Sequence, residues 1–472
     1  MNFFEKIFII TVFNKYIRNL KEVLSLVVIP REEQPALKKA WFTYSLILIN
    51  IIVYVYTSYN NLLLTSTNES IYKLGFIPQI LLEDPVQGVL RIFTSMFTHA
   101  NIFHIFFNMY FLWIFGRSVE NAIGHKRFLI LYLLSGIAAS IFYFAFIPIG
   151  GYDSLVIPAI GASGAISGIL GAYLLLFPNT KLMFCLFFIF IPICIPVSSI
   201  IFLIIWFSEQ VIYGFLELGG VAYFAHVGGF ITGIFLSYVF FKDSSVRLNY
   251  HLLMEYSSMM EKIGIKGMPR RIGKWTKYFL TFLFILILLA FSSGTAEVYA
   301  TNTNIYFLNV TANGQSDVVV LKLYSGKAEV SQSSVDEVRI LLNRIPESFI
   351  CNKELANKNI TYREFYNVTI NGVSVPVFLD AVFSYRYDGI VDYASGNIST
   401  YIVLTDIYGN SNLDGKVNIS FNMTSQYTNI KEPLVISSSA SILLTIGAII
   451  SLFRIEEALS VSFYDLWRER WI

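Results

Sequence analysis

Eight long apolar segments constrain the fold of this chain more than any other feature. A helix that crosses a bilayer needs about 20 mostly apolar residues and pairs its own backbone groups where water is absent. With 55% hydrophobic and 14% charged residues, the chain holds more apolar side chains than one soluble core needs. It is predicted to be a polytopic α-helical membrane protein with a six-helix core and two further spanning helices. The segments are 41–59, 102–118, 128–149, 163–177, 198–216, 225–241, 278–292 and 433–453.

Basic residues orient these helices and divide the chain. The stretch 242–277 holds eight Lys or Arg against three acidic residues, which predicts a cytoplasmic position. The chain then enters the first helix from the cytoplasm and leaves the sixth helix in the cytoplasm. The seventh helix crosses to the outside and the eighth returns, so both termini are expected in the cytoplasm. The predicted units are an N-terminal segment (1–40), the core (41–241), a basic linker (242–277), a seventh helix (278–293), an outer domain (294–432), an eighth helix (433–453) and a tail (454–472).

The outer region 294–432 is predicted to be β-rich and sandwich-like. Its β-branched and aromatic runs are broken by Gly, Asn and Asp, as in short strands joined by turns. It has no catalytic motif, so we expect it to shield the protein or to recruit substrates or partners. N-x-S/T triplets in this region and in the first outer loop predict a glycosylated exterior, with candidate sites at Asn68, Asn309, Asn359, Asn367, Asn397, Asn418 and Asn422.

Two other stretches leave alternatives open. The N-terminal segment has apolar residues at helical spacing and basic residues between them, which fits an interfacial helix or a cytosolic amphipathic helix, but not a cleaved signal peptide. The run MFCLFFIFIPICIPV, with Pro192 and Pro196, predicts an irregular connection or a re-entrant turn. The histidines and cysteines lack the spacing of a metal site, and a net charge of +2 gives no pull toward nucleic acid, so neither a cofactor nor a nucleic-acid partner is expected.

Polar residues in spanning helices are costly and therefore indicate candidate sites. His104 and Asn108 are four residues apart in HIFFN, so both side chains point from one helix face. Ser163 opens one apolar helix, and His226 lies at the start of another. No aspartate lies near either residue in the sequence, so any catalytic unit that they form is predicted to be a dyad.

Small residues give both of these helices a bare face. Such faces let helix backbones approach closely, which would bring Ser163 to His226. A serine beside a histidine base is the minimum unit of an activated nucleophile. The free N–H groups at the start of the Ser163 helix, with His104 and Asn108, can stabilise an oxyanion. The small residues are Gly164, Gly168 and Gly171 in the first helix, and Gly229 and Gly233 in the second.

Three motifs in this order resemble those of the rhomboid intramembrane serine proteases: HIFFN (104–108), GASG (161–164) and AHVGGFITG (225–233). The resemblance covers about 41–241. It implies a serine endopeptidase that cleaves single-pass membrane proteins within or beside their spanning helix through an acyl-enzyme. The substrate would enter from the lipid bilayer past a mobile fifth helix.

The resemblance also implies roles for individual residues. Ser163 would be the nucleophile and His226 the base, with His104, Asn108 and the Ser163 N–H as the oxyanion hole. Gly161 belongs to the serine motif. Glu120 would brace the first outer loop, Arg91 would be that loop's arginine, and His99 would bond within the loop. Two departures stand out: Ser167 replaces a frequent aromatic residue, and Leu90 precedes Arg91 where tryptophan is usual.

Two further functions are compatible with a membrane chain. A catalytically inactive rhomboid-like protein binds membrane clients, but such proteins typically lack the serine or the histidine, and both are present. A transporter usually needs charged residues inside the membrane for ion coupling, and these helices have few. The protease is therefore the favoured function.

Overall fold

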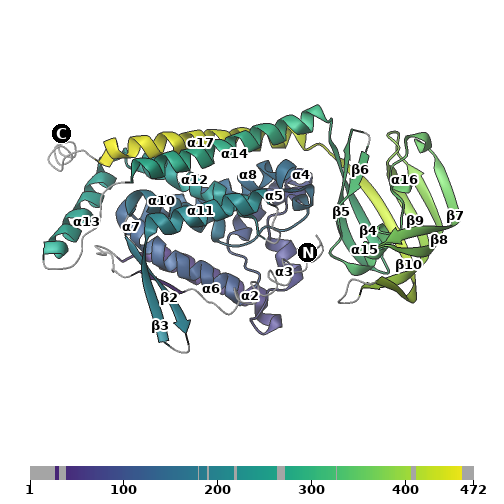
Figure 1. Cartoon of the computed structure of the whole chain (residues 1–472), viewed down its shortest axis with the longest axis horizontal. Coiled ribbons are helices and arrows are strands. Elements are labelled where there is room, and N and C mark those ends of the chain that lie inside the picture. Colours follow the sequence, from purple (N-terminus) through teal and green to yellow (C-terminus); the bar gives the residue numbers. More distant parts are fainter. Residues whose placement is uncertain are drawn as a thin grey trace, which may run out of the picture.

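The computed structural model describes residues 27–30, 39–178, 180–188, 191–216, 221–262, 272–325, 327–405 and 411–459. A helical bundle and a β domain lie end to end (Figure 1). The predicted interfacial helix of 1–40 falls almost wholly outside these residues, and so does most of the tail. The core helices are α2 (Trp41–Ser58), α6 (Ile102–Phe111) continued by the π-helical η2 (Leu112–Gly116) and α7 (Arg117–Ile123), α8 (His125–Ala145), α10 (Ser163–Leu176), α11 (Ser199–Phe215) and α12 (Tyr223–Phe240).

All eight predicted spanning segments are helices. Six helical stretches of the described chain are long and apolar enough to cross a membrane, and α10 and α11 are shorter apolar helices. The two helices beyond the core, α14 (Lys274–Ala300) and α17 (Lys431–Leu459), are longer than predicted and lie side by side along the bundle (Figure 1). Within the linker, α13 spans Ser244–Lys262. The polytopic helical fold with two added helices is thus confirmed.

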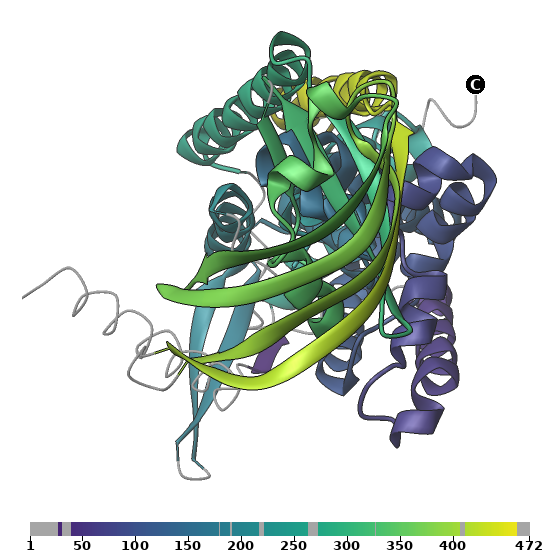
Figure 2. The ribbon, with the colours of Figure 1, turned by 90° about the vertical axis from the view of Figure 1, so that its right-hand side faces the viewer.

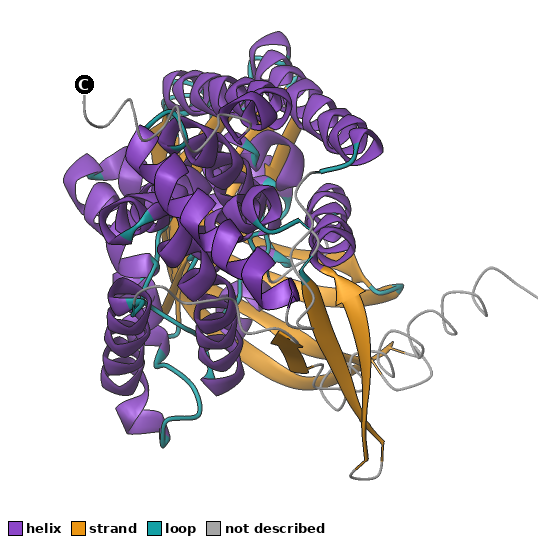
Figure 3. Ribbon diagram, turned by 90° about the vertical axis from the view of Figure 1, so that its left-hand side faces the viewer, coloured by secondary structure: helices purple, strands orange, loops and turns teal. Residues whose placement is uncertain are grey.

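The proline-containing run forms a β-hairpin of two regular paired strands, so the prediction of an irregular connection was wrong. The alternative of a re-entrant turn stays a prediction. β2 (Lys181–Phe188) pairs antiparallel with β3 (Ile191–Ser198), and β1 (Val27–Pro30) pairs with the other edge of β2. Figure 3 shows the hairpin projecting from the bundle. Its prolines lie in β3, which is an edge strand, the position in a sheet where proline is tolerated. An edge position therefore reconciles these prolines with regular strand structure.

Glycines bring α10 and α12 into backbone contact. A Cβ at Gly229 would lie 1.9 Å from the Gly164 carbonyl oxygen, and one at Gly233 would lie 1.9 Å from that of Gly168. A Cβ at Gly171 would lie 2.2 Å from the Phe230 carbonyl oxygen. These oxygens belong to backbone and cannot turn aside. The bare face of α12 therefore packs on α10 as predicted, through Gly229 and Gly233. On α10 only Gly171 points at α12, whereas Gly164 and Gly168 point at Ala139 and Ser135 of α8.

We expect Gly233→Ala to destabilise the bundle, because the new methyl group would force α10 and α12 apart. Overpacking of this kind costs about 1–3 kcal/mol. Thermal unfolding in detergent should show a lowered Tm. Gly415→Ala is the matched control, since no atom lies within 4 Å of the Cβ position there. Equal Tm values for the two variants would show that the contact does not limit stability.

Glu120 stabilises the start of α2, so the prediction that it braces the first outer loop was wrong. Its buried carboxylate accepts hydrogen bonds from the backbone N–H groups of Phe42 (3.0 Å) and Thr43 (2.8 Å), and from Thr43 Oγ1 (2.6 Å). A carboxylate at a helix N-terminus meets unpaired N–H groups and the positive end of the dipole. The first loop follows the opposite end of α2.

Arg91 does lie in the first loop, where Nη1 donates to the Tyr72 carbonyl oxygen at 2.6 Å. This bond joins α5 (Pro85–Ser95) to α3 (Asn68–Leu74); α4 (Pro78–Glu83) lies between them in the chain. Leu90, which precedes the arginine, is 53% exposed. The loop is therefore held by the arginine itself.

The β domain is one curved sheet, so the predicted sandwich was wrong in its layering. Seven strands follow the order β6-β5-β4-β10-β9-β8-β7, and every neighbouring pair is antiparallel (Figure 2). Two short helices, α15 (Asp336–Leu342) and α16 (Glu347–Ile350), cover one face in place of a second sheet. The strands are β4 (Asn304–Ala312), β5 (Gln315–Tyr324), β6 (Lys327–Val330), β7 (Asn359–Ile370), β8 (Val373–Tyr385), β9 (Val391–Thr405) and β10 (Ser411–Thr428).

The β domain docks on one end of the bundle through a separate apolar cluster. Ile305, Phe307 and Val320 of the sheet pack with Phe144 at the end of α8 and with Leu155 of η3 (Tyr152–Leu155). The two ends of the domain also lie together, since Lys431 Nζ donates to Asn302 Oδ1 at 2.8 Å. The domain is therefore an insertion between the adjacent ends of α14 and α17.

Candidate active site

Ser163 is the first residue of α10 and follows a bend that requires glycine. Gly161 has a φ of +117°, which residues with a side chain rarely adopt. A Cβ at Gly161 would also lie 2.7 Å from His104 Nε2. Glycine is therefore needed here for the backbone conformation and for the approach of His104.

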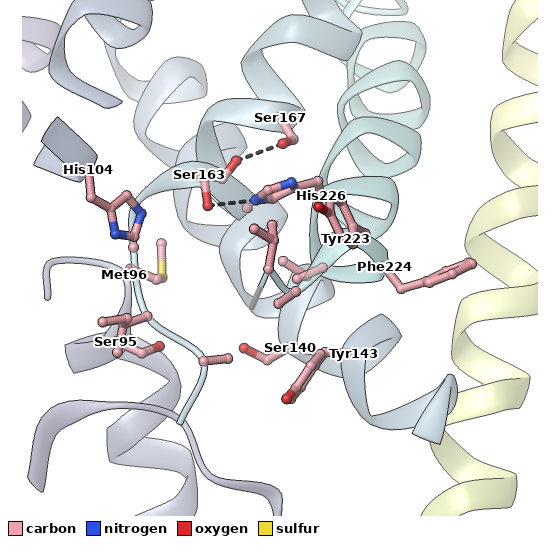
Figure 4. A pocket seen from close by; sticks show the side chains of 18 of the residues that line it. Ser95, Met96, His104, Ser140, Tyr143, Ser163, Ser167, Tyr223, Phe224 and His226 are labelled. Atoms are coloured by element: carbon pink, nitrogen blue, oxygen red, sulfur yellow. Dashed lines mark hydrogen bonds between the residues drawn. The ribbon is translucent and has the colours of Figure 1, made fainter. Parts of the chain in front are cut away.

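The side chains of Ser163 and His226 meet at the N-terminal ends of α10 and α12, the ends nearer the β domain. The distance from Ser163 Oγ to His226 Nε2 is 2.8 Å, within hydrogen-bond range (Figure 4). The glycine contacts described above set this distance, because they fix how closely the two helices lie. The pair expected from the sequence is thus brought together.

Two side chains of α11 orient His226, and neither was found from the sequence. His226 Nδ1 lies 2.7 Å from Gln210 Oε1, and Gln210 is 5% exposed. The Trp206 ring lies against the imidazole with ring centroids 6.2 Å apart and 30° between the planes. With the amide oxygen as acceptor, Nδ1 carries the proton and Nε2 is free to accept from Ser163. A glutamine within a mainly apolar helix, in the polar group Ser208, Glu209 and Gln210, is the signal that could have indicated Gln210.

Ser167 stands where the resemblance leads one to expect an aromatic residue against the histidine. Its hydroxyl instead donates to the Ser163 carbonyl oxygen at 2.7 Å (Figure 4). The imidazole is therefore supported from α11 and not from the serine helix.

His104 lies on the opposite side of Ser163 from His226 (Figure 4), and Asn108 follows it one turn later on α6. The Ala100 N–H donates to His104 Nδ1 at 3.4 Å, so in the neutral ring Nε2 carries the proton. Nε2 is the atom that lies beside Gly161. Asn108 Nδ2 donates to the His104 carbonyl oxygen at 2.9 Å, which leaves a second amide hydrogen. Both residues line the cavity that holds Ser163.

His99 ties the first loop to the residue before Ser163. Its buried ring accepts a hydrogen bond at Nε2 from the Ala162 N–H at 3.5 Å, and its carbonyl oxygen accepts one from Ser66 Oγ at 2.6 Å. This is the bonding role that the resemblance implied for it.

The cavity around Ser163 has a volume of about 990 Å³ and is mainly apolar. Residues from α6, α8, α10, α11 and α12 line it, with the segment from Gly150 to Gly161. Phe103 and Phe107 of α6 belong to both the lining and the exposed apolar surface. The cavity therefore reaches the flank of the bundle beside α6 and can admit an elongated ligand from that side.

Comparison with protein families matches the Rhomboid domain to residues 86–243. The chain is 30% identical over 234 residues to RHOMBOID-like protein 6, mitochondrial, of Arabidopsis thaliana, an alignment that spans 42% of this chain and 68% of that relative. The chain belongs to the rhomboid family.

Two further rhomboid relatives match smaller shares of their own length. Rhomboid protein 1, mitochondrial, of Saccharomyces cerevisiae is 32% identical over 155 residues, which cover 33% of this chain and 43% of that relative. Rhomboid protease GluP of Bacillus subtilis is 33% identical over 199 residues, which cover 42% of this chain and 34% of that relative. The Rhomboid domain match contains Ser163, His226, His104 and Asn108, whereas α14, the β domain and α17 lie outside it.

Proposed function

We propose that this rhomboid is an intramembrane serine endopeptidase that cleaves single-pass transmembrane proteins within or beside their spanning helix. The observation that carries the proposal is the 2.8 Å approach of Ser163 Oγ to His226 Nε2 inside a cavity of about 990 Å³. An inactive client-binding rhomboid would have no need of this pair. The relative named a protease, GluP of Bacillus subtilis, adds support from outside the structure.

The proton path follows from the tautomers. His226 Nε2 accepts the Ser163 hydroxyl proton while Ser163 Oγ attacks the scissile carbonyl carbon. The Nδ1–H bond to Gln210 Oε1 keeps the imidazole in the orientation that this transfer needs and stabilises the imidazolium. His226 then gives the proton to the leaving amine nitrogen as the C–N bond breaks. A water molecule, deprotonated by His226, then attacks the acyl carbon, and His226 returns the proton to Ser163 Oγ as the ester C–O bond breaks.

The oxyanion forms on the side of Ser163 where the donors lie. The His104 Nε2–H, the Ser163 N–H and the free amide hydrogen of Asn108 are available to it. Donors fixed in advance around a developing charge are worth several kcal/mol in a site that excludes bulk water. Gly161 contributes by leaving room for the His104 ring.

The substrate helix enters between α6 and α11 in this proposal. Phe103, Phe107 and Phe111 of α6 and Trp206 and Tyr213 of α11 line the two sides of the cavity. An apolar peptide suits such walls, because its side chains meet aromatic surface until the scissile bond reaches Ser163. The purified chain in detergent should therefore cleave a model single-pass substrate, and failure on every such substrate would contradict the proposal.

Gln210 is a positioning residue in this mechanism, and Gln210→Leu tests it. Leucine has a similar volume but cannot accept the Nδ1–H bond. Loss of a bond worth about 1–3 kcal/mol should lower kcat about 10- to 100-fold, with KM unchanged. Gln210→Glu keeps the acceptor and should restore most of the rate. A leucine variant with the wild-type kcat would exclude this role.

We also propose that the β domain lies outside and selects substrates by their outer portions. Its docking cluster includes Leu155 and Ile147, and Ile147 also lines the catalytic cavity. The domain is thereby held at a fixed position beside the site. A substrate with a large outer portion must pass this domain to place its helix at Ser163.

Deletion of residues 302–431 with a short linker tests this role. The linker can be short because Asn302 and Lys431 are bonded to each other, so α14 and α17 keep their spacing. We expect kcat/KM to change several-fold for substrates with folded outer portions and to stay the same for a substrate with a short outer tail. Unchanged values for both classes would contradict selection by the domain.

A further inference from the structure

All seven N-x-S/T triplets of the full sequence lie at one end of the molecule. Six fall in the β domain, and the seventh begins at Asn68 in the first loop. The first loop and the β domain share that end, since Leu82 of α4 packs on the docking cluster of the sheet. The segments that lead to the opposite end of the bundle contain no triplet. The triplets are thus concentrated at the end of the molecule that holds the β domain.

The six asparagines of the β domain lie on one face of the sheet, here called the asparagine face. Strand register places them there: Asn309 is opposite Thr424, and Asn397 is opposite Ser420. Their strand neighbours Leu308, Val310, Ile398 and Ile419 point into the other face, which α15 and α16 cover. The side chains of all six asparagines are exposed. The asparagine face therefore consists of Asn309, Asn359, Asn367, Asn397, Asn418 and Asn422.

The triplets also form two reciprocal pairs across neighbouring strands. Asn309 is opposite Thr424 while Asn422 is opposite Thr311, so each asparagine faces the hydroxyl residue of the other triplet. Asn397 and Asn418 are arranged in the same way with Ser420 and Ser399. The acceptor and its hydroxyl residue are two apart, which is the strand period, so each whole triplet presents itself on one face.

The fold does not otherwise require asparagine at these positions. Asparagine is depleted in strands, whereas it tolerates left-handed turns. The domain uses it for such turns at Asn313, Asn357 and Asn371, where φ lies between 48° and 58°. Among the six strand asparagines, only the Asn418 side chain has a hydrogen bond in the described part of the chain, from Ser399 Oγ. Five of the six amide side chains are therefore exposed and without a hydrogen bond in the described chain, so they are available for modification.

We propose that the asparagine face is N-glycosylated, and that Asn68 carries a further glycan. A lipid-linked oligosaccharide diphosphate is the donor. The asparagine Nδ2 bonds to the anomeric carbon of the sugar, the bond from that carbon to the diphosphate breaks, and Nδ2 loses one proton. The glycans then project from the side of the sheet opposite α15 and α16, so protein partners have access to the helix-covered side.

The apolar docking surface and the glycan positions divide the same face of the sheet. Ile305, Phe307 and Val320 occupy the part that packs on the bundle, and none of the triplets begins there. Asn309 follows Phe307 on β4 and is exposed, although Val318, opposite it on β5, packs at the edge of the cluster. Glycans at the six positions are thus compatible with the docked domain.

The test uses the full chain purified from its native membranes. Peptide mass spectrometry should find glycans at asparagines of two or more strands of the asparagine face, and enzymatic removal of N-glycans should lower the intact mass. Thr424→Ala should remove the glycan of Asn422 alone, while Thr424→Ser should keep it. Asn412→Gln, an exposed asparagine of β10 outside any triplet, should leave the mass of the glycans unchanged.

Unmodified peptides at all seven asparagines would overturn the inference. In that case the alternation of asparagine with apolar residues would serve only to keep one face of the sheet polar. Neither result depends on proteolysis, because the modification is read by mass and the protease proposal is read by cleavage.

Discussion

Ser163→Ala should abolish cleavage of a single-pass substrate, with a loss on the order of 10³-fold or more. The variant keeps Cβ but has no oxygen to attack the carbonyl carbon. The fold should survive, because the substitution removes the hydrogen bond from Ser163 to His226 but leaves the glycine contacts that pack α10 on α12. The measurement is the initial rate of product formation by the purified chain, beside its Tm.

Ser167→Ala is the matched control for this prediction. Ser167 lies on the same helix, is buried, and donates to the Ser163 carbonyl oxygen without touching the imidazole nitrogens. It should keep most of the activity. A Ser163→Ala variant that cleaves at the rate of Ser167→Ala would rule out the assigned nucleophile.

His226→Ala should reduce the rate by a similarly large factor, because no other base lies within hydrogen-bond range of Ser163 Oγ in the described chain. Residues that act as one catalytic unit are not additive. The variant that carries both Ser163→Ala and His226→Ala should therefore be no slower than either single variant. A further drop in the double variant would mean that the two side chains act independently.

A second histidine variant, His251→Ala, shows whether the loss of activity is specific to the base His226. His251 lies on α13, away from the cavity lining. We expect His251→Ala to retain the wild-type rate in the same assay. Equal losses in the His226 and His251 variants would point to general destabilisation.

The meeting of Ser163 and His226 could be predicted from the sequence because glycines of α12 and Gly171 of α10 let the two backbones touch. Glycine spacing determines how closely two helices approach, and that is a local property of each segment. Strand content in the β domain could be predicted for a similar reason, since alternation along a strand is local. The layers of the β domain could not be predicted, because α15 and α16 are too short to be recognised in the sequence as helices that cover the sheet.

The support of His226 could not be predicted, because it depends on how α11 is rotated about its axis. Packing of Phe207 on Phe230, with ring centroids 4.5 Å apart, accompanies the orientation that turns Gln210 and Trp206 toward the imidazole. That rotation follows from tertiary contacts and leaves no motif. The role of Glu120 was missed for a related reason: a buried carboxylate takes the nearest unpaired N–H groups, and these belong to α2.

Reaction of the purified chain with a fluorophosphonate tests the central claim most directly, since this reagent bonds covalently to a serine hydroxyl that a neighbouring base activates. Peptide mass spectrometry should locate the adduct on Ser163, and His226→Ala should abolish the labelling while leaving Tm unchanged. An unlabelled Ser163 in the wild-type chain, or equal labelling in the His226→Ala variant, would contradict the Ser163–His226 dyad.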